Sequence, residues 1–192
     1  MFKQNCDLVW FTETLKNKSL IEKIKKIKLI ITDIDGCLTD SNVYGIREDK
    51  GFSVQDGFAT KQAQKQGVKI AFLTGKDSPH VKERAKILGI PDELVFIGVY
   101  KNKIEKVKQI QESLGIPKEE TLYFGDDFLD YEAKDAVELF TCPLNTPFYI
   151  QKQADLIIPK NGGVNVFRLL LDLVLYVQNK HFAQKLITTS VN

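Results

Sequence analysis

The sequence has little cysteine and little histidine. Its three cysteines, Cys6, Cys37 and Cys142, are odd in number, widely spaced and without a CxxC pair. A disulfide framework or a zinc site is therefore not expected, and a reducing compartment is the default. The two histidines, His80 and His181, lie far apart in the chain, which argues against a metal site built on imidazole.

An excess of one charge and a long apolar run are also missing. The 192 residues carry a formal net charge of +2 at pH 7, which is too mild to indicate binding to nucleic acid or to an anionic membrane. No apolar run approaches the ~18 residues that a membrane span needs. The N-terminus lacks the basic-then-apolar order of a secretory signal. We therefore expect a cytoplasmic protein with neither a nucleic-acid nor a membrane partner.

What the sequence does contain is an alternation of short apolar runs with helical patterns, in a composition with 43% hydrophobic residues. The predicted strands are 28–33, 68–75, 93–98, 121–127, 137–141 and 155–159. The predicted helices are 56–67, 77–89, 101–115 and 162–180. Strands that are apolar on both faces and separated by helices indicate one doubly wound α/β domain with a central parallel sheet.

The domain is expected over residues 26–180. Residues 1–25 have the pattern of an N-terminal extension, and residues 181–192 that of a tail which frays or docks on a neighbour. The segment 40–57 breaks the alternation, because two short β-like pieces flank the turn-rich connection 45–51. This pattern predicts a small inserted β-hairpin after the first strand.

Polar side chains gather where the predicted strands end. Three strands together supply four carboxylates, a hydroxyl and a glycine, namely Asp33, Asp35, Asp126, Asp127, Thr74 and Gly75. Ligands of doubly wound sheets bind at the carboxyl ends of the strands, so we expect these groups to line one rim. Four anions together require a cation, and carboxylate oxygens without histidine or thiolate favour Mg²⁺.

Such a rim suits a phosphoryl group. One carboxylate can attack phosphorus, and a second one two residues away can protonate the leaving alcohol and then activate water. Lys103, which opens the helix after the third strand, is placed to neutralise the charge that builds on the phosphoryl oxygens. Each of these residues taken alone can have a purely structural role, since Asp126 and Asp127 can simply cap a helix and Thr74 can be a buried hydroxyl. The order of all the pieces together indicates a site.

Four stretches in this order, DIDGCLTD, LTGKDS, NK and GDDFLD, resemble the motifs of haloacid dehalogenase-type phosphatases. More narrowly, about residues 25–180 resemble the capless phosphatases of 3-deoxy-D-manno-octulosonate 8-phosphate, whose relatives act on nonulosonate 9-phosphates. The stretches SVQDGFA, NTPFYIQKQAD and NGGVNVFRLLLDLVL echo the same group. The resemblance implies a Mg²⁺-dependent phosphatase of lipopolysaccharide biosynthesis that acts through an aspartyl phosphate.

The resemblance also implies catalytic and metal-binding roles. Asp33 is then the nucleophile and a Mg²⁺ ligand. Asp35 is the acid/base and gives its backbone carbonyl to the metal. Lys103 bridges the nucleophile and the phosphate, and Asp126 is a further metal ligand.

Substrate-binding and supporting roles follow from the same resemblance. Thr74 and the Gly75 amide hold the phosphate, with Lys76 as a substrate-binding cation. Asp127 is a further metal ligand, direct or through water, and Asp130 orients the lysine at the start of the helix.

The spacing of the motifs leaves no room for a cap domain. Asp33 and Thr74 are 41 positions apart, and Thr74 and Lys103 are 29 apart. Because phosphoryl chemistry gains from excluding water, either a large substrate or another subunit must close the site. The resemblance implies a homotetramer in which inserted hairpins form a shared barrel and a neighbour's C-terminal segment reaches the site.

Some positions depart from the family pattern. Gln55 stands where an arginine or lysine is expected, Asn165 stands at a glycine position and Leu169 at a glutamate position. The cations that can compensate are Arg47, Lys50, Lys61, Lys76 and Arg168.

The alternative substrate is a nonulosonate 9-phosphate. Two other classes also stay open, a phospho-accepting receiver domain, which Asp35 argues against, and a non-catalytic oligomeric domain, which the intact motif set disfavours.

Overall fold

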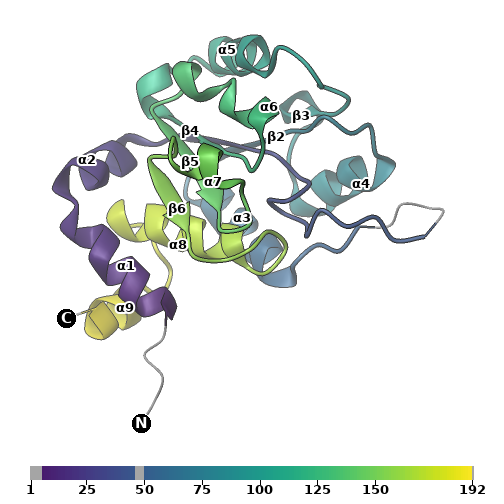
Figure 1. Cartoon of the computed structure of the whole chain (residues 1–192). Helices are drawn as coiled ribbons and strands as arrows, with labels where there is room; N and C mark the ends of the chain where they lie inside the picture. Colours follow the sequence, from purple (N-terminus) through teal and green to yellow (C-terminus); the bar gives the residue numbers. More distant parts are fainter. Residues whose placement is uncertain (1–5, 46–49, 192) are drawn as a thin grey trace.

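The computed structural model describes residues 6–45 and 50–191 (Figure 1). Six parallel strands form one sheet in the order β3-β2-β1-β4-β5-β6. The strands are β1 (Leu29–Thr32), β2 (Lys69–Leu73), β3 (Val95–Phe96), β4 (Thr121–Phe124), β5 (Leu139–Pro143) and β6 (Leu156–Ile158). The chain winds from β1 to one edge and then from β4 to the other, which confirms the predicted doubly wound α/β domain.

Helices cover both faces of this sheet. They are α1 (Cys6–Lys16), α2 (Lys18–Lys26), α3 (Val54–Lys65), α4 (Pro79–Leu88), α5 (Lys103–Leu114), α6 (Phe128–Tyr131), α7 (Phe148–Gln151), α8 (Val166–Val177) and α9 (Gln184–Val191). In Figure 1, α5 and α6 lie above the sheet, and α3 and α8 pack together below it. All four residues of β1 and of β4 are buried, as expected for central parallel strands covered on both faces.

The third strand is shorter than predicted. Residues 92–94 form a 3₁₀ turn after Pro91, and only Val95 and Phe96 pair with β2. Asp92 and Glu93 are exposed, so the start of this segment lies in solvent. The predicted stop at Gly89 is confirmed, because this residue takes the left-handed conformation that ends α4.

The first two helices and the last one pack on the domain, and α1 and α9 contact each other. Trp10 of α1 donates a hydrogen bond from Nε1 to the carbonyl oxygen of Ile157 at 2.9 Å. Gln178 donates to the carbonyl oxygens of Ile24 and Ile27 and so holds the end of α2. The predicted tail forms α9, which lies beside α1 near both termini (Figure 1). Within one chain, then, the C-terminal segment docks on the N-terminal helices.

The segment predicted as a hairpin differs in part. The prediction of a second β-like piece is wrong. Phe52 is not part of a strand, and Val54 begins α3 with Ser53 as the helix cap. Ser53 accepts hydrogen bonds from the amides of Gln55 and Asp56, which stabilises the helical start. The middle of the connection, 46–49, lies outside the described residues.

Over the described ranges no helix is long and apolar enough to cross a membrane.

Candidate active site

The turn after β1 brings its acidic residues to the rim of the sheet. Asp33 continues the hydrogen-bond ladder to β4, and three successive amides, 37–39, converge on the carbonyl oxygen of Ile34. Gly36 has φ +86, and a Cβ there would lie 1.9 Å from a carboxylate oxygen of Asp126. Glycine therefore permits both the tight turn and the close approach of a second strand end.

A second loop supports this turn from behind. Asn145, after β5, donates a hydrogen bond to the carbonyl oxygen of Gly36 at 3.2 Å and accepts one from the amide of Gly162 at 2.7 Å. A Cβ on Gly162 would lie 1.9 Å from the same carbonyl oxygen. The sequence analysis did not assign Asn145 a role, although it opens the NTPFYI stretch that carried part of the resemblance.

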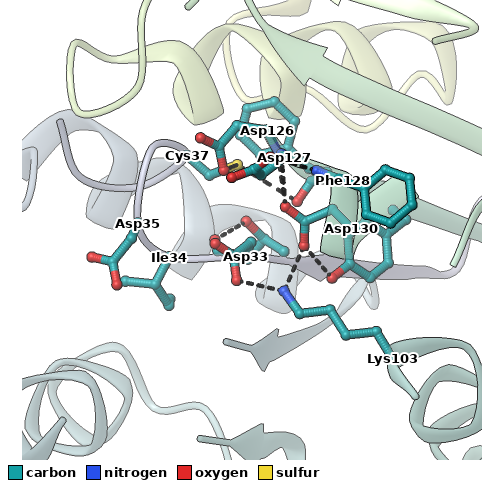
Figure 2. A network of polar contacts seen from close by, with 12 residues as sticks. Asp33, Ile34, Asp35, Cys37, Lys103, Asp126, Asp127, Phe128 and Asp130 are labelled. Carbon is teal, nitrogen blue, oxygen red and sulfur yellow. Dashed lines mark hydrogen bonds and ion pairs between the residues drawn. The ribbon is translucent and has the colours of Figure 1, made fainter. Parts of the chain in front are cut away.

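Lys103 joins two carboxylates at the centre of the site. Its Nζ lies 2.9 Å from Asp33 Oδ1 and 2.6 Å from Asp130 Oδ1, and all three side chains are buried (Figure 2). Burial lowers the pKa of Lys103, but the charges of Asp130 and Asp33 outweigh it and leave the pKa above its usual range. The lysine is therefore a fixed positive charge against the Asp33 carboxylate.

Asp130 is fully engaged by hydrogen bonds. Its Oδ1 accepts from Lys103 and from the Tyr123 hydroxyl, the latter at 2.9 Å. Its Oδ2 accepts from the amides of Asp126 and Asp127 at 3.0 and 3.1 Å. With these four donors in place, Asp130 orients the lysine and the loop after β4.

The remaining carboxylates fit a hard divalent cation. Ligand atoms of Asp33, Asp126 and Asp130 lie within 4.8 Å of one another. Burial raises the pKa of Asp33 to about 7, with repulsion from Asp130 adding to the rise and Lys103 opposing it. Burial, followed by repulsion from Asp130 and Asp33, raises the pKa of Asp126 to about 8. One lysine thus leaves this cluster with excess negative charge, which a divalent ion held by Asp33 and Asp126 would neutralise.

The neighbouring cysteine does not change this preference. Cys37 Sγ lies 3.9 Å from Asp126 Oδ1, and burial together with the Asp126 charge raises its pKa. The thiol is therefore protonated, and the donor set consists of oxygen atoms.

These groups line a cavity of about 310 Å³ at the carboxyl ends of the strands. Its lining includes the predicted Asp33, Asp35, Thr74, Gly75, Lys76, Lys103, Asp126, Asp127 and Asp130. It also includes three residues that the sequence analysis missed, namely Ser41, Tyr100 and Leu129. Ser41 and Tyr100 lie in loops beside motif residues, where no periodicity distinguishes them from ordinary loop positions, whereas Leu129 lies in α6, within the GDDFLD stretch. The structure therefore brings every predicted site residue to one cavity.

Asp35 points away from the central cluster (Figure 2). It accepts a hydrogen bond from Thr39 Oγ1 at 3.3 Å and forms an ion pair with Lys50. The Lys50 side chain is only 1% exposed. Lys50 was expected among the cations that compensate for departures from the family pattern, but here it is paired with the predicted acid/base.

Asp127 has the position of a helix cap. Its carboxylate accepts a hydrogen bond from the amide of Phe128 at 2.6 Å, and together with Asp130 it forms a capping box at the start of α6. The alternative of a simple capping residue therefore has direct support, while the side chain still lines the cavity.

The other candidate cations differ in where they lie relative to the cavity. Arg168 pairs with Asp172 at 2.6 Å and lies over the rings of Phe58 and Phe182. Lys61 is exposed on α3, and Arg47 lies outside the described residues. Of the five, Lys76 lines the cavity.

Comparisons with known proteins agree with this geometry. Residues 59–134 match the family model of haloacid dehalogenase-like hydrolases. A 3-deoxy-D-manno-octulosonate 8-phosphate phosphatase KdsC from Haemophilus influenzae is 33% identical over 165 residues, which cover 83% of this chain and 88% of the relative. The KdsC of Escherichia coli K12 is 30% identical, with 84% and 86% covered.

Solved structures with bound metal are similar as well. A KdsC structure from Moraxella catarrhalis, in complex with magnesium, phosphate and KDO, superposes with a TM-score of 0.81 at 29% identity, and covers 92% of this chain and 99% of that one. The cobalt-bound Haemophilus influenzae phosphatase gives a TM-score of 0.78 at 33% identity, with 82% and 92% covered.

The fold and the site thus define a haloacid dehalogenase-like hydrolase. Within that class the chain belongs to the KdsC family of 3-deoxy-D-manno-octulosonate 8-phosphate phosphatases, since relatives at 30–33% identity match it over most of both lengths.

Proposed function

We propose that this chain is a Mg²⁺-dependent phosphatase that hydrolyses 3-deoxy-D-manno-octulosonate 8-phosphate, with a nonulosonate 9-phosphate as the alternative substrate. The observation that carries the proposal is the buried Asp33 carboxylate, which is held by Lys103 at 2.9 Å on the floor of the cavity. A buried carboxylate fixed by one lysine and facing an open cavity is suited to attack an electrophile that enters there.

The first step is attack by Asp33 on phosphorus. A carboxylate oxygen of Asp33 forms a bond to phosphorus while the ester bond to the sugar oxygen breaks, and Asp35, which carries a proton for this step, donates it to that leaving oxygen. Thr74 and the Gly75 amide hold the phosphoryl oxygens, and Lys103 offsets the charge that develops on them. The products of this step are the free sugar acid and an aspartyl phosphate.

The second step releases phosphate. Asp35, now ionised, takes a proton from water as the water oxygen bonds to phosphorus and the bond to Asp33 breaks. Asp33 and Asp126 would hold Mg²⁺, which supplies positive charge to the phosphoryl oxygens when bound. Asp130 keeps Lys103 in place throughout, through the ion pair at 2.6 Å.

We also propose a cytoplasmic homotetramer in which neighbouring subunits close the site, as the family resemblance implies. Apolar side chains near the turn after β1 support this assembly, since Leu144, Phe148, Tyr149 and Val164 are more than half exposed. Exposed apolar surface is typical of protein–protein contacts where it is contiguous. Light scattering on the purified chain measures the mass, and a monomer at working concentration would contradict this part.

A phosphate-release assay with Mg²⁺ tests the function. The panel contains octulosonate 8-phosphate, a nonulosonate 9-phosphate and a hexose 6-phosphate, and Asp33→Asn serves as the inactive control. We expect the octulosonate ester to give the highest kcat/KM and the Asp33 variant to fold but not turn over. A lasting phosphoprotein formed from acetyl phosphate, without steady release, would instead favour the receiver class.

A further inference from the structure

Tyr100 is an exposed aromatic side chain at the mouth of a polar cavity. It is 57% exposed and lines the same cavity as Asp33, Thr74 and Lys103. The other lining residues are mostly carboxylates, amines and hydroxyls, so Tyr100 and Leu129 are the large apolar side chains among them. Ligand sites combine such apolar walls with a few polar groups that fix orientation.

The ring is held against the loop that carries the predicted phosphate-binding residues. Its nearest carbons lie 3.3 and 3.4 Å from the place where a Cβ on Gly75 would be. The amide of Val99, one residue before the tyrosine, donates to the carbonyl oxygen of Thr74 at 3.0 Å. The backbone that carries the ring is therefore fixed to Thr74, which lines the same cavity.

The loop of Tyr100 is also bent in a defined way at both ends. Gly98 has φ +73 and Asn102 has φ 59, and Lys103 follows directly. With one left-handed residue at each end, the three-residue segment 99–101 is restricted in the directions that its side chains take. The tyrosine ring and the lysine amine are thus set relative to each other by one short loop.

We infer that Tyr100 is a specificity-determining residue, which packs its ring against the carbon chain that adjoins the phosphate of the substrate. This inference rests on the proposed phosphatase function, because the phosphate held by Thr74, Gly75 and Lys103 sets where that carbon chain begins. A chain of C–H groups leaving the phosphate passes the ring and buries apolar surface against it. The ligand class is a phosphate ester of a polyhydroxylated carbon chain longer than two carbons.

Small phosphate compounds provide the contrast. Acetyl phosphate and orthovanadate occupy the phosphate position but have too few carbons, or none, to cover the ring. Turnover of acetyl phosphate and inhibition by orthovanadate should therefore be independent of Tyr100, whereas turnover of a sugar-acid phosphate should depend on it.

The test compares Tyr100→Ala and Tyr100→Phe with the wild-type enzyme, and with Lys101→Ala as an exposed neighbour in the same loop. For octulosonate 8-phosphate, we expect Tyr100→Ala to raise KM about tenfold with a smaller change in kcat, since a lost aromatic contact of this size corresponds to about one decade in affinity. Tyr100→Phe and Lys101→Ala should stay within about twofold of wild type. Acetyl phosphate turnover and vanadate inhibition should be the same in all four proteins.

Two results would overturn the inference. In one, KM for the sugar-acid phosphate is unchanged in Tyr100→Ala. In the other, acetyl phosphate and vanadate lose as much as the sugar ester, which would make the ring a support for the Gly75 loop. If the wild type prefers a different ester, the proposed substrate fails, while the same comparison on that ester still decides the role of Tyr100.

Discussion

Lys103 and Asp130 form an ion pair inside the site, with 2.6 Å between Nζ and Oδ1 and side chains that are 3% and 2% exposed. A buried pair of this kind is costly to break from one side, because the remaining charge loses its partner. Lys103 needs that partner to stay against the Asp33 carboxylate, so the pair connects the interior of the fold to the predicted nucleophile.

Replacement of Asp130 tests this connection. Asp130→Asn removes the charge that holds Lys103, and we expect kcat to fall about 10- to 100-fold, as for other residues that orient a catalytic group. Unfolding in urea should show a loss of about 3 kcal/mol. Asp135→Asn, at an exposed position nearby, is the control and should behave as wild type. Unchanged kcat in Asp130→Asn would contradict the orienting role.

The contact between two glycine-containing loops gives a second prediction. Gly162→Ala would place a Cβ 1.9 Å from the carbonyl oxygen of Gly36, so the turn that carries Asp33 and Asp35 must move. We expect kcat/KM to fall at least about tenfold and the free energy of unfolding to fall by about 1–3 kcal/mol. Gly51→Ala is the matched control, because no atom of the described residues lies within 4 Å of its Cβ position. Equal activity of the two variants would show that the turn does not depend on this contact.

The sequence predicted most of the fold because the strands are strongly apolar on both faces. A strand at 28–33 and a helix that closes on Gly89 were both expected from local pattern, and the structure has β1 at Leu29–Thr32 and the end of α4 at Gly89. The predicted β-like piece at Phe52–Val54 failed because Ser53 caps a helix, and a cap competes with a short alternating pattern.

The predicted residues of the site converge because parallel strands end at one rim. The contacts that fix and support these residues are not visible in the sequence. The ion pair of Lys50 with Asp35 joins residues 15 positions apart, and Asn145 reaches Gly36 over 109 positions. Contacts of that kind depend on tertiary packing, which neither periodicity nor motif spacing encodes.

The Lys50 ion pair leads to a third prediction. Because Lys50 is buried and paired with Asp35, Lys50→Gln removes the charge that fixes the predicted acid/base. We expect kcat/KM for the preferred ester to fall about tenfold, with recovery of part of the activity in Lys50→Arg. Lys61→Gln, on the exposed face of α3, should leave kcat/KM unchanged. The idea fails if Lys50→Gln and Lys61→Gln are equally active.

The raised pKa values predict how pH acts on the metal-free protein. Asp33 and Asp126 have pKa values near 7 and 8 when folded, against an ordinary value of 3.8. At pH values between the unfolded and the folded pKa, these two carboxyl groups bind more protons in the folded state than in the unfolded state. The free energy of unfolding should therefore fall as pH rises from about 4 to about 8. Thermal unfolding in a chelator measures this slope, which should be smaller in Asp126→Asn.

Added Mg²⁺ should reverse the trend. A metal held by Asp33 and Asp126 requires both carboxylates in ionised form, so the rise in Tm on adding Mg²⁺ should be larger at pH 8 than at pH 6. Asp126→Asn should lose most of that rise. A Mg²⁺-induced shift that is independent of pH and persists in the variant would place the ion elsewhere.

The most direct measurement is to locate the phosphoryl group during turnover. Acid quenching of the enzyme with substrate and Mg²⁺, followed by peptide mass spectrometry, should find phosphate on the peptide that contains Asp33, and none on that peptide in Asp33→Asn. Phosphate on another residue, or turnover that continues in Asp33→Asn, would contradict the account.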